Sequence, residues 1–169
     1  GSVLGSGSST ITNNGSTDFT LAGTVNGTLV TTGTSYTTLV NGVVLGGIDS
    51  SSGTLSMQDG ALNTTVTVNG DATFAGTLEF DIDLSDGSSA GDIINVSGDV
   101  SGSNVTLSFN NFVGDANAGD IDGITLITYG GDADLTFGDL QGLPSFGPID
   151  YFVQDDGAGN ITLETQVNS

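Results

Sequence analysis

The stretch GTLEFDIDLSDGSSAGDIINVSGDVSGSNVTLSF, residues 76–109, contains the pattern that decides the fold class. Within it, the apolar residues Phe80, Ile82 and Leu84 alternate with three acidic residues. Successive side chains of a β-strand point to opposite faces, so alternation with a period of two indicates a strand. This stretch therefore predicts a strand with one apolar face and one face of carboxylates.

The same alternation continues along the chain in short runs that end at Gly, Asn-Gly or Asp-Gly. Such runs between turn residues are typical of strands, and no segment shows a helical period. The strands are expected at 17–22, 34–40, 61–68, 72–84, 103–109, 122–128, 149–154 and 160–165. The sequence predicts an all-β fold.

Two all-β architectures fit this pattern. A β-sandwich needs about seven strands in two antiparallel sheets. A parallel β-helix (β-solenoid) instead stacks short strands turn on turn, and at roughly 20–25 residues per turn the chain would make about seven turns. The short strands and the Gly-rich corners favour the β-helix, and the β-sandwich is the alternative.

Composition excludes several kinds of partner. The 169 residues include no Lys, Arg or His and 20 acidic residues, which gives a formal net charge of −20. Nucleic acid and anionic membranes attract Lys and Arg and repel such a chain. With 36% hydrophobic residues the chain is too apolar for a disordered acidic tail. The lack of cysteine and of basic residues suits an exposed bacterial surface better than the cytosol.

The organisation along the chain changes near residue 70. Residues 1–70 are rich in Thr, Ser and Gly, whereas Phe, Ile and Asp become common in residues 71–169. We interpret this as a change of composition along one continuous element. Residues 1–20 lack the basic start and apolar run of a signal peptide, and no stretch has transmembrane length. An exported protein of this kind would therefore be a processed fragment.

The second half also carries a series of short motifs in a recognisable order. They are Gly91–Val96 (GDIINV), Thr125–Thr128 (TLIT), Phe137, Tyr151–Leu163 and Thr165–Asn168 (TQVN). In this order they resemble the C-terminal part of bacterial autotransporter passenger domains, over roughly residues 70–168. The resemblance implies a right-handed parallel β-helix at the cell surface or secreted. It also implies a stable C-terminal end that helps the passenger to fold during export.

The residue types present restrict the possible enzyme chemistry. Without His, Cys or Lys there is no ordinary base or thiol for nucleophilic catalysis, and no P-loop lysine for phosphoryl transfer. A carboxylate pair acting as a glycosidase is the chemistry that remains. Asp81 and Asp83, about 6.7 Å apart along a strand, would be its candidates. We expect no enzymatic activity.

Acidic residues without a cation also suggest calcium, which prefers oxygen ligands. The candidate metal ligands are Asp81, Asp83, Asp86 and Asp92. Further candidate groups are Asp132, Asp134 and Asp139, and Asp155, Asp156 and Asn160. The other interpretation of these residues is a solvated acidic face, and no other cofactor is indicated.

The sequence therefore predicts a non-enzymatic extracellular structural or adhesive protein, such as a surface stalk, an adhesin shaft or a fibre subunit. The alternatives are a calcium-stabilised S-layer or biofilm matrix protein and, third, a carboxylate glycosidase on a β-helix. The expected partners are other copies of the chain, joined by strand complementation into an oligomer or filament. A surface glycan and a host or matrix protein are further partners to consider.

Overall fold

The structure is a computed structural model that describes residues 9–16, 18–112, 119–145 and 147–168. The described residues form 15 strands joined in one sheet, which confirms the all-β prediction. Pairing within this sheet is largely parallel, so it does not fit a β-sandwich of antiparallel sheets. Among these residues there is no helix long and apolar enough to cross a membrane.

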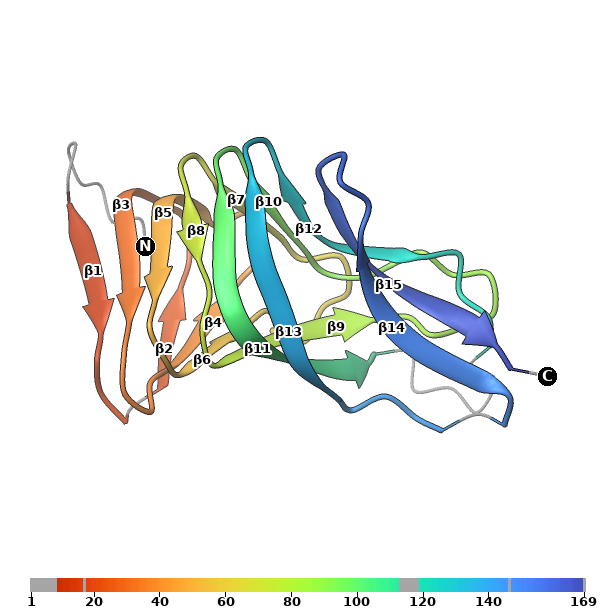
Figure 1. The fold of residues 1–169 in the computed structure, drawn as a ribbon. Helices are drawn as coiled ribbons and strands as arrows, with labels where there is room; N and C mark the ends of the chain where they lie inside the picture. Colours follow the sequence, from red (N-terminus) through yellow and green to blue (C-terminus); the bar gives the residue numbers. More distant parts are fainter. Residues whose placement is uncertain (1–8, 17, 113–118, 146, 169) are drawn as a thin grey trace.

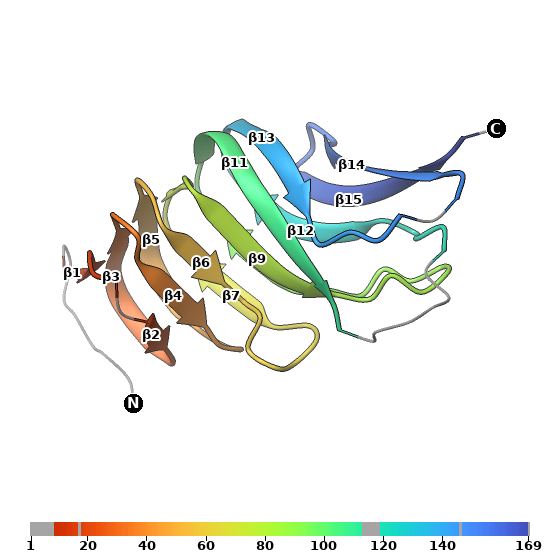
Figure 2. The ribbon, with the colours of Figure 1, turned by 90° about the horizontal axis from the view of Figure 1, so that it is seen from below.

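The strands stack in three columns, which Figures 1 and 2 show from two directions. The first column holds the leading parts of β3 (Thr24–Thr31) and β5 (Val44–Ser50), then β7 (Thr65–Val68), β10 (Ile93–Val96) and β12 (Ile124–Tyr129). The second holds β1 (Thr10–Asn13), the later parts of β3 and β5, β8 (Ala72–Thr73), the start of β11 (Val100–Asn111) and β13 (Ala133–Gln141). The third holds β2 (Asp18–Leu21), β4 (Tyr36–Leu39), β6 (Thr54–Ser56), β9 (Thr77–Ile82) and the ends of β11 and β13.

An antiparallel hairpin closes the first column at its C-terminal end. It consists of β14 (Ile149–Asp155) and β15 (Asn160–Val167), and β15 pairs antiparallel with β12. Elsewhere β5 pairs with β8 and β6 pairs with β9, so strands from both sides of residue 70 belong to the same sheet.

The distance along the chain between paired strands increases from one end to the other. Near the N-terminus, Thr10 pairs with Thr28, 18 residues later. Near the C-terminus, Val100 pairs with Ala133, 33 residues later. Turns of the chain near the C-terminus are therefore longer than those near the N-terminus. The extra residues lie in the connections between the columns.

The core lies between the three columns and is built from the alternate residues of each strand. In the third column Leu55, Leu78 and Leu107 occupy the same register position on successive strands, and all are buried. Phe80 and Phe109 stack in the same way, with ring centroids 6.0 Å apart. Burial of each such side chain contributes about 1.5–3 kcal/mol, so these ladders hold neighbouring turns together.

At the corner between the first and second columns, the glycine positions leave no room for a side chain. A Cβ added at Gly70 would lie 2.4 Å from the carbonyl oxygen of Gly46, and one added at Gly98 would lie 2.8 Å from that of Gly70. These contacts are shorter than real Cβ atoms make, so the backbone of successive turns packs directly at this corner. These contacts fix the position of each turn relative to the preceding one, and with it the position of the residues that follow the glycine.

Candidate functional site

Two of the predicted acidic residues, Asp81 and Asp92, are brought together inside the protein. Asp81 is 1% exposed and Asp92 is fully buried. Oδ2 of Asp92 accepts the backbone N–H of Asp81 at 2.6 Å, and Oδ1 accepts the backbone N–H of Thr64 at 2.8 Å. Oδ1 of Asp81 accepts a hydrogen bond from Nδ2 of Asn110 at 2.7 Å, whereas its buried Oδ2 has no partner.

Burial disfavours the charged form of both side chains. It raises the pKa of Asp92 from 3.8 to about 7, against the opposing effect of the hydrogen bonds from the backbone of Asp81 and Thr64. Burial likewise raises the pKa of Asp81, while the hydrogen bond from Asn110 lowers it. The pair therefore carries less negative charge at neutral pH than two ordinary aspartates do.

The interpretation of the candidate metal ligands as a solvated acidic face is wrong for Asp81 and Asp92, because both side chains are buried. The chain after β9 folds back on itself, with an antiparallel bridge between Ile82 and Gly91. The backbone N–H of Asp92 donates to the carbonyl oxygen of Asp81 at 2.9 Å, which closes this return. The outward face of β9 is thus covered at Asp81 by the residues that follow the strand, whereas Thr77 and Glu79 stay half-exposed. On the adjacent strand Asp81 meets Asn110 and not another acid, so acidic rows do not stack here.

The other two members of the predicted cluster point elsewhere. Oδ1 of Asp83 accepts the backbone N–H and the hydroxyl of Ser85, at 2.9 and 2.6 Å, and the hydroxyl bond holds the pKa of Asp83 below its usual value. Oδ1 of Asp86 accepts the backbone N–H of Asp120 at 3.1 Å. Among the described residues, no three acidic side chains lie close enough together to hold a metal ion. Calcium binding by Asp81, Asp83, Asp86 and Asp92 stays a prediction.

Of the two further candidate groups, the first includes exposed residues of β13 and the second lies at the turn between β14 and β15. Asp134 and Asp139 are exposed on β13. Asp156 accepts the backbone N–H groups of Ala158 and Asn160, and the side chain of Asn160 lowers its pKa. These bonds form the turn of the hairpin that joins β14 to β15.

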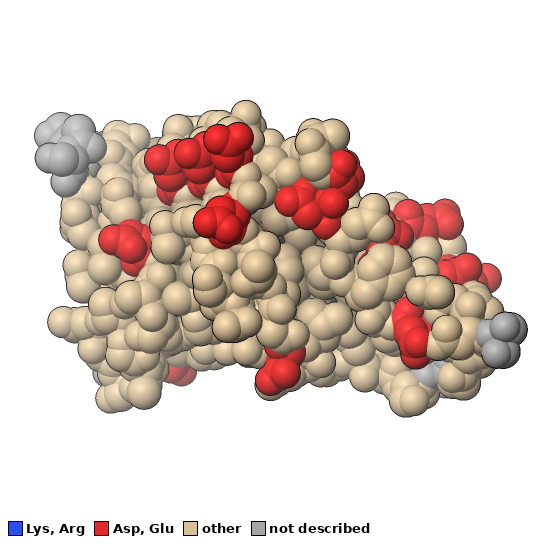
Figure 3. All heavy atoms as spheres, in the orientation of Figure 1, with Lys and Arg blue, Asp and Glu red and all other residues tan. Residues whose placement is uncertain are grey.

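A ladder of aspartates, which the sequence interpretation missed, runs along the corner between the first and second columns. Oδ1 of Asp71 accepts the backbone N–H of Asp99 at 2.9 Å, and Oδ1 of Asp99 accepts that of Asp132 at 2.8 Å. A Cβ added at Gly98 would lie 2.1 Å from Oδ1 of Asp71, so the preceding glycine makes room for each carboxylate. Figure 3 shows acidic side chains gathered over the turns that lead into β8, β11 and β13.

A sequence signal for this ladder exists. An alternating apolar pair is followed by one residue and then Gly-Asp, at Val66–Asp71, Ile94–Asp99 and Ile127–Asp132. The three copies are 28 and 33 residues apart. The unequal spacing conceals the repeat from a search for a fixed period.

The comparisons with known proteins give a partial relationship. No family model matches the chain. Over 95 residues it is 38% identical to the probable autotransporter YfaL of Escherichia coli (strain K12), a stretch that covers 56% of this chain and 7% of that protein. The chain is thus a distant, partial homologue of a probable autotransporter, which confirms the predicted resemblance and is consistent with a passenger segment. It spans about 7% of the length of this curated relative.

Proposed function

We propose that this chain is a non-enzymatic shaft in the surface-exposed passenger of an autotransporter-related protein. The observation that carries the proposal is the stack of parallel strands closed at one end by the β14–β15 hairpin, in a chain related to a probable autotransporter. Such a stack extends in one direction and buries a continuous core, as a stalk or an adhesin shaft requires. We infer that it is a right-handed parallel β-helix.

Several features support a structural role over catalysis. The chain has no His, Cys, Lys or Arg. Of the two candidate glycosidase residues, Asp81 is 1% exposed and gives a polysaccharide no access. Its carboxylate and that of Asp92 bind protein groups within the fold. The calcium-stabilised S-layer or matrix protein has no comparable observation in its favour.

We further infer that the protein works outside the cell. Its net charge of −20 favours solubility there and repels nucleic acids. The hairpin at the C-terminal end would let this region fold as a stable unit on which preceding turns of a passenger can stack. Leu163 of β15 is central to it, because this fully buried residue pairs with Ile124 on one side and Val153 on the other.

The proposal is tested by placing the chain between an epitope-tagged export signal and an outer-membrane β-barrel in a Gram-negative host. Antibody binding to intact cells measures display of the tag. We expect display of the native chain and a severalfold loss in Leu163→Asp, which introduces a charge into the core. Thr162→Asp is the matched control, since Thr162 lies next to Leu163 on the same strand and is only half-buried. Failure of the native chain to reach the surface, or equal display of the two variants, would contradict the proposal.

A further inference from the structure

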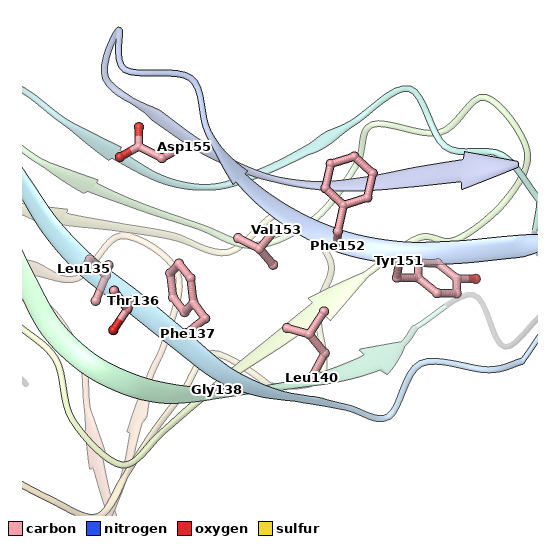
Figure 4. A pocket seen from close by; sticks show the side chains of 9 residues that line it. All are labelled: Leu135, Thr136, Phe137, Gly138, Leu140, Tyr151, Phe152, Val153 and Asp155. Atoms are coloured by element: carbon pink, nitrogen blue, oxygen red, sulfur yellow. The ribbon is translucent and has the colours of Figure 1, made fainter. Parts of the chain in front are cut away.

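A groove of about 450 Å³ lies between β13 and β14. Its walls include the apolar side chains of Leu135, Phe137 and Leu140 from β13 and the side chains of Tyr151, Phe152 and Val153 from β14. Figure 4 shows these side chains on the two strands that border the groove. This volume is within the range of ligand sites, roughly 300–1,000 Å³.

Both strands that border the groove have an unpaired edge. In the described part of the chain β13 pairs with β11 alone, and β14 pairs with β15 alone. The hydrogen-bonding groups on the other edge of each strand are therefore free to accept a further strand. Extended segments that bind proteins commonly add to a sheet at such an edge, where their alternate side chains enter pockets.

Side chains along the two strands alternate between the core and solvent. The half-buried Leu135, Phe137 and Val153 pack against the core. Four of the exposed positions on these strands carry acidic residues. These are Asp134 and Asp139 on β13 and Asp150 and Asp155 on β14. Asp155 also lines the groove, and its Oδ1 accepts hydrogen bonds from Tyr129 and Gly157. A strand added here would meet apolar side chains on its inner face and carboxylates along its outer face.

From this arrangement we propose that the groove binds an extended segment of a second protein in which apolar residues alternate with Lys or Arg. The apolar residues fill the groove, and the basic residues face the four flanking aspartates. Charge complementarity selects this occupant over a second copy of the chain, because a copy contains no Lys or Arg and brings a further 20 acidic residues. This interaction surface goes beyond the proposed role as a shaft.

The test uses the whole chain and a fluorescently labelled seven-residue peptide of alternating lysine and valine, with binding measured by anisotropy. One comparison peptide replaces lysine by glutamate. A second replaces the central valine by proline, which removes a backbone donor and disfavours strand pairing. We expect the lysine–valine peptide to bind and both comparison peptides to bind at least tenfold more weakly.

Two double variants with the same net charge separate the groove from the rest of the acidic surface. Asp134→Asn/Asp139→Asn removes two charges beside the groove and is expected to weaken binding about fivefold. Asp18→Asn/Asp49→Asn removes two exposed charges from β2 and β5 and is expected to leave binding within about twofold.

Three outcomes would overturn the proposal. The first is no binding of the lysine–valine peptide at millimolar concentration. The second is equal binding of the proline peptide, or an equal loss in both double variants, which would mean unspecific attraction to an acidic surface. The third is a dimer in sedimentation experiments whose formation blocks binding of the peptide, which would assign the groove to a second copy. None of these depends on export, so the proposed shaft function is tested separately.

Discussion

Oδ2 of Asp92 accepts a hydrogen bond of 2.6 Å from the backbone N–H of Asp81, and both side chains are buried. In a chain without Lys or Arg, backbone amides take the place that a cation would otherwise fill. Buried carboxylates that accept amide hydrogen bonds avoid part of the cost of desolvation, although the charge itself stays uncompensated. Protonation of this pair is therefore expected to change the stability of the fold.

Asp81→Asn should stabilise the protein at pH 8. The substitution removes a buried charge and keeps the oxygen that accepts from Asn110. We expect a gain of about 1–2 kcal/mol, or roughly 2–8 °C in the Tm. Asp49→Asn is the control, because it makes the same change of charge at an exposed site and should shift stability by less than about 0.5 kcal/mol. A lower Tm in Asp81→Asn would show that the charged form is the stabilising one.

Stability should fall as pH rises from about 4 to about 7. The folded-state pKa of Asp92 is about 7 against 3.8 unfolded, so in this interval the folded protein keeps a proton that the unfolded chain has lost. The loss is roughly 4 kcal/mol at most. Below about pH 4 the lowered pKa of Asp83 has the opposite effect, which places the maximum near pH 4. Urea unfolding at pH 4.5, 6 and 8 in 0.5 M NaCl, which screens surface repulsion, measures this. A free energy of unfolding independent of pH would exclude a buried titrating pair.

Asp99→Ala should loosen the aspartate ladder, whereas Asp99→Asn should preserve it. Alanine leaves the backbone N–H of Asp132 without its acceptor, at a cost of about 0.5–1 kcal/mol. Asparagine keeps an oxygen in that place and removes one of three neighbouring charges. Hydrogen exchange of the Asp132 amide, followed by NMR, should accelerate in the alanine variant alone. Equal exchange in both variants would mean that water replaces the carboxylate without loss.

Calcium and magnesium at the same concentration should raise the Tm equally. The four candidate ligands do not converge, and both oxygens of Asp92 already accept backbone hydrogen bonds. Divalent ions would then act by screening the surface charge. Thermal melts with 2 mM of either ion, and with a chelator, compare the two. A rise specific to calcium that disappears in Asp83→Asn/Asp86→Asn would instead establish the predicted site.

The alternation of apolar residues was sufficient to predict the fold class. It placed Phe80 and Ile82 in the core, where both are fully buried. It failed for Asp81, because alternation describes only the strand itself. The cover over this residue comes from the return of the chain to Asp92, a contact that no local pattern encodes.

The glycines show a similar division. Asp-Gly and Asn-Gly indicate turns, and Gly42, Gly87, Gly123 and Gly157 do adopt positive φ. At Gly70 the reason for glycine is instead the carbonyl oxygen of Gly46 on the neighbouring turn. That requirement depends on which turns are stacked, so the sequence of one turn alone cannot reveal it.

The increase from 18 to 33 residues between paired strands makes the two ends of the described structure unequal in size. The narrow end presents a short turn and the wide end a long one, so the molecule is a taper with a fixed polarity. A regular filament of identical units joined end to end would require these two outlines to match. The proposed shaft would accordingly be slender at the end that carries β1 and broad at the end that carries β13.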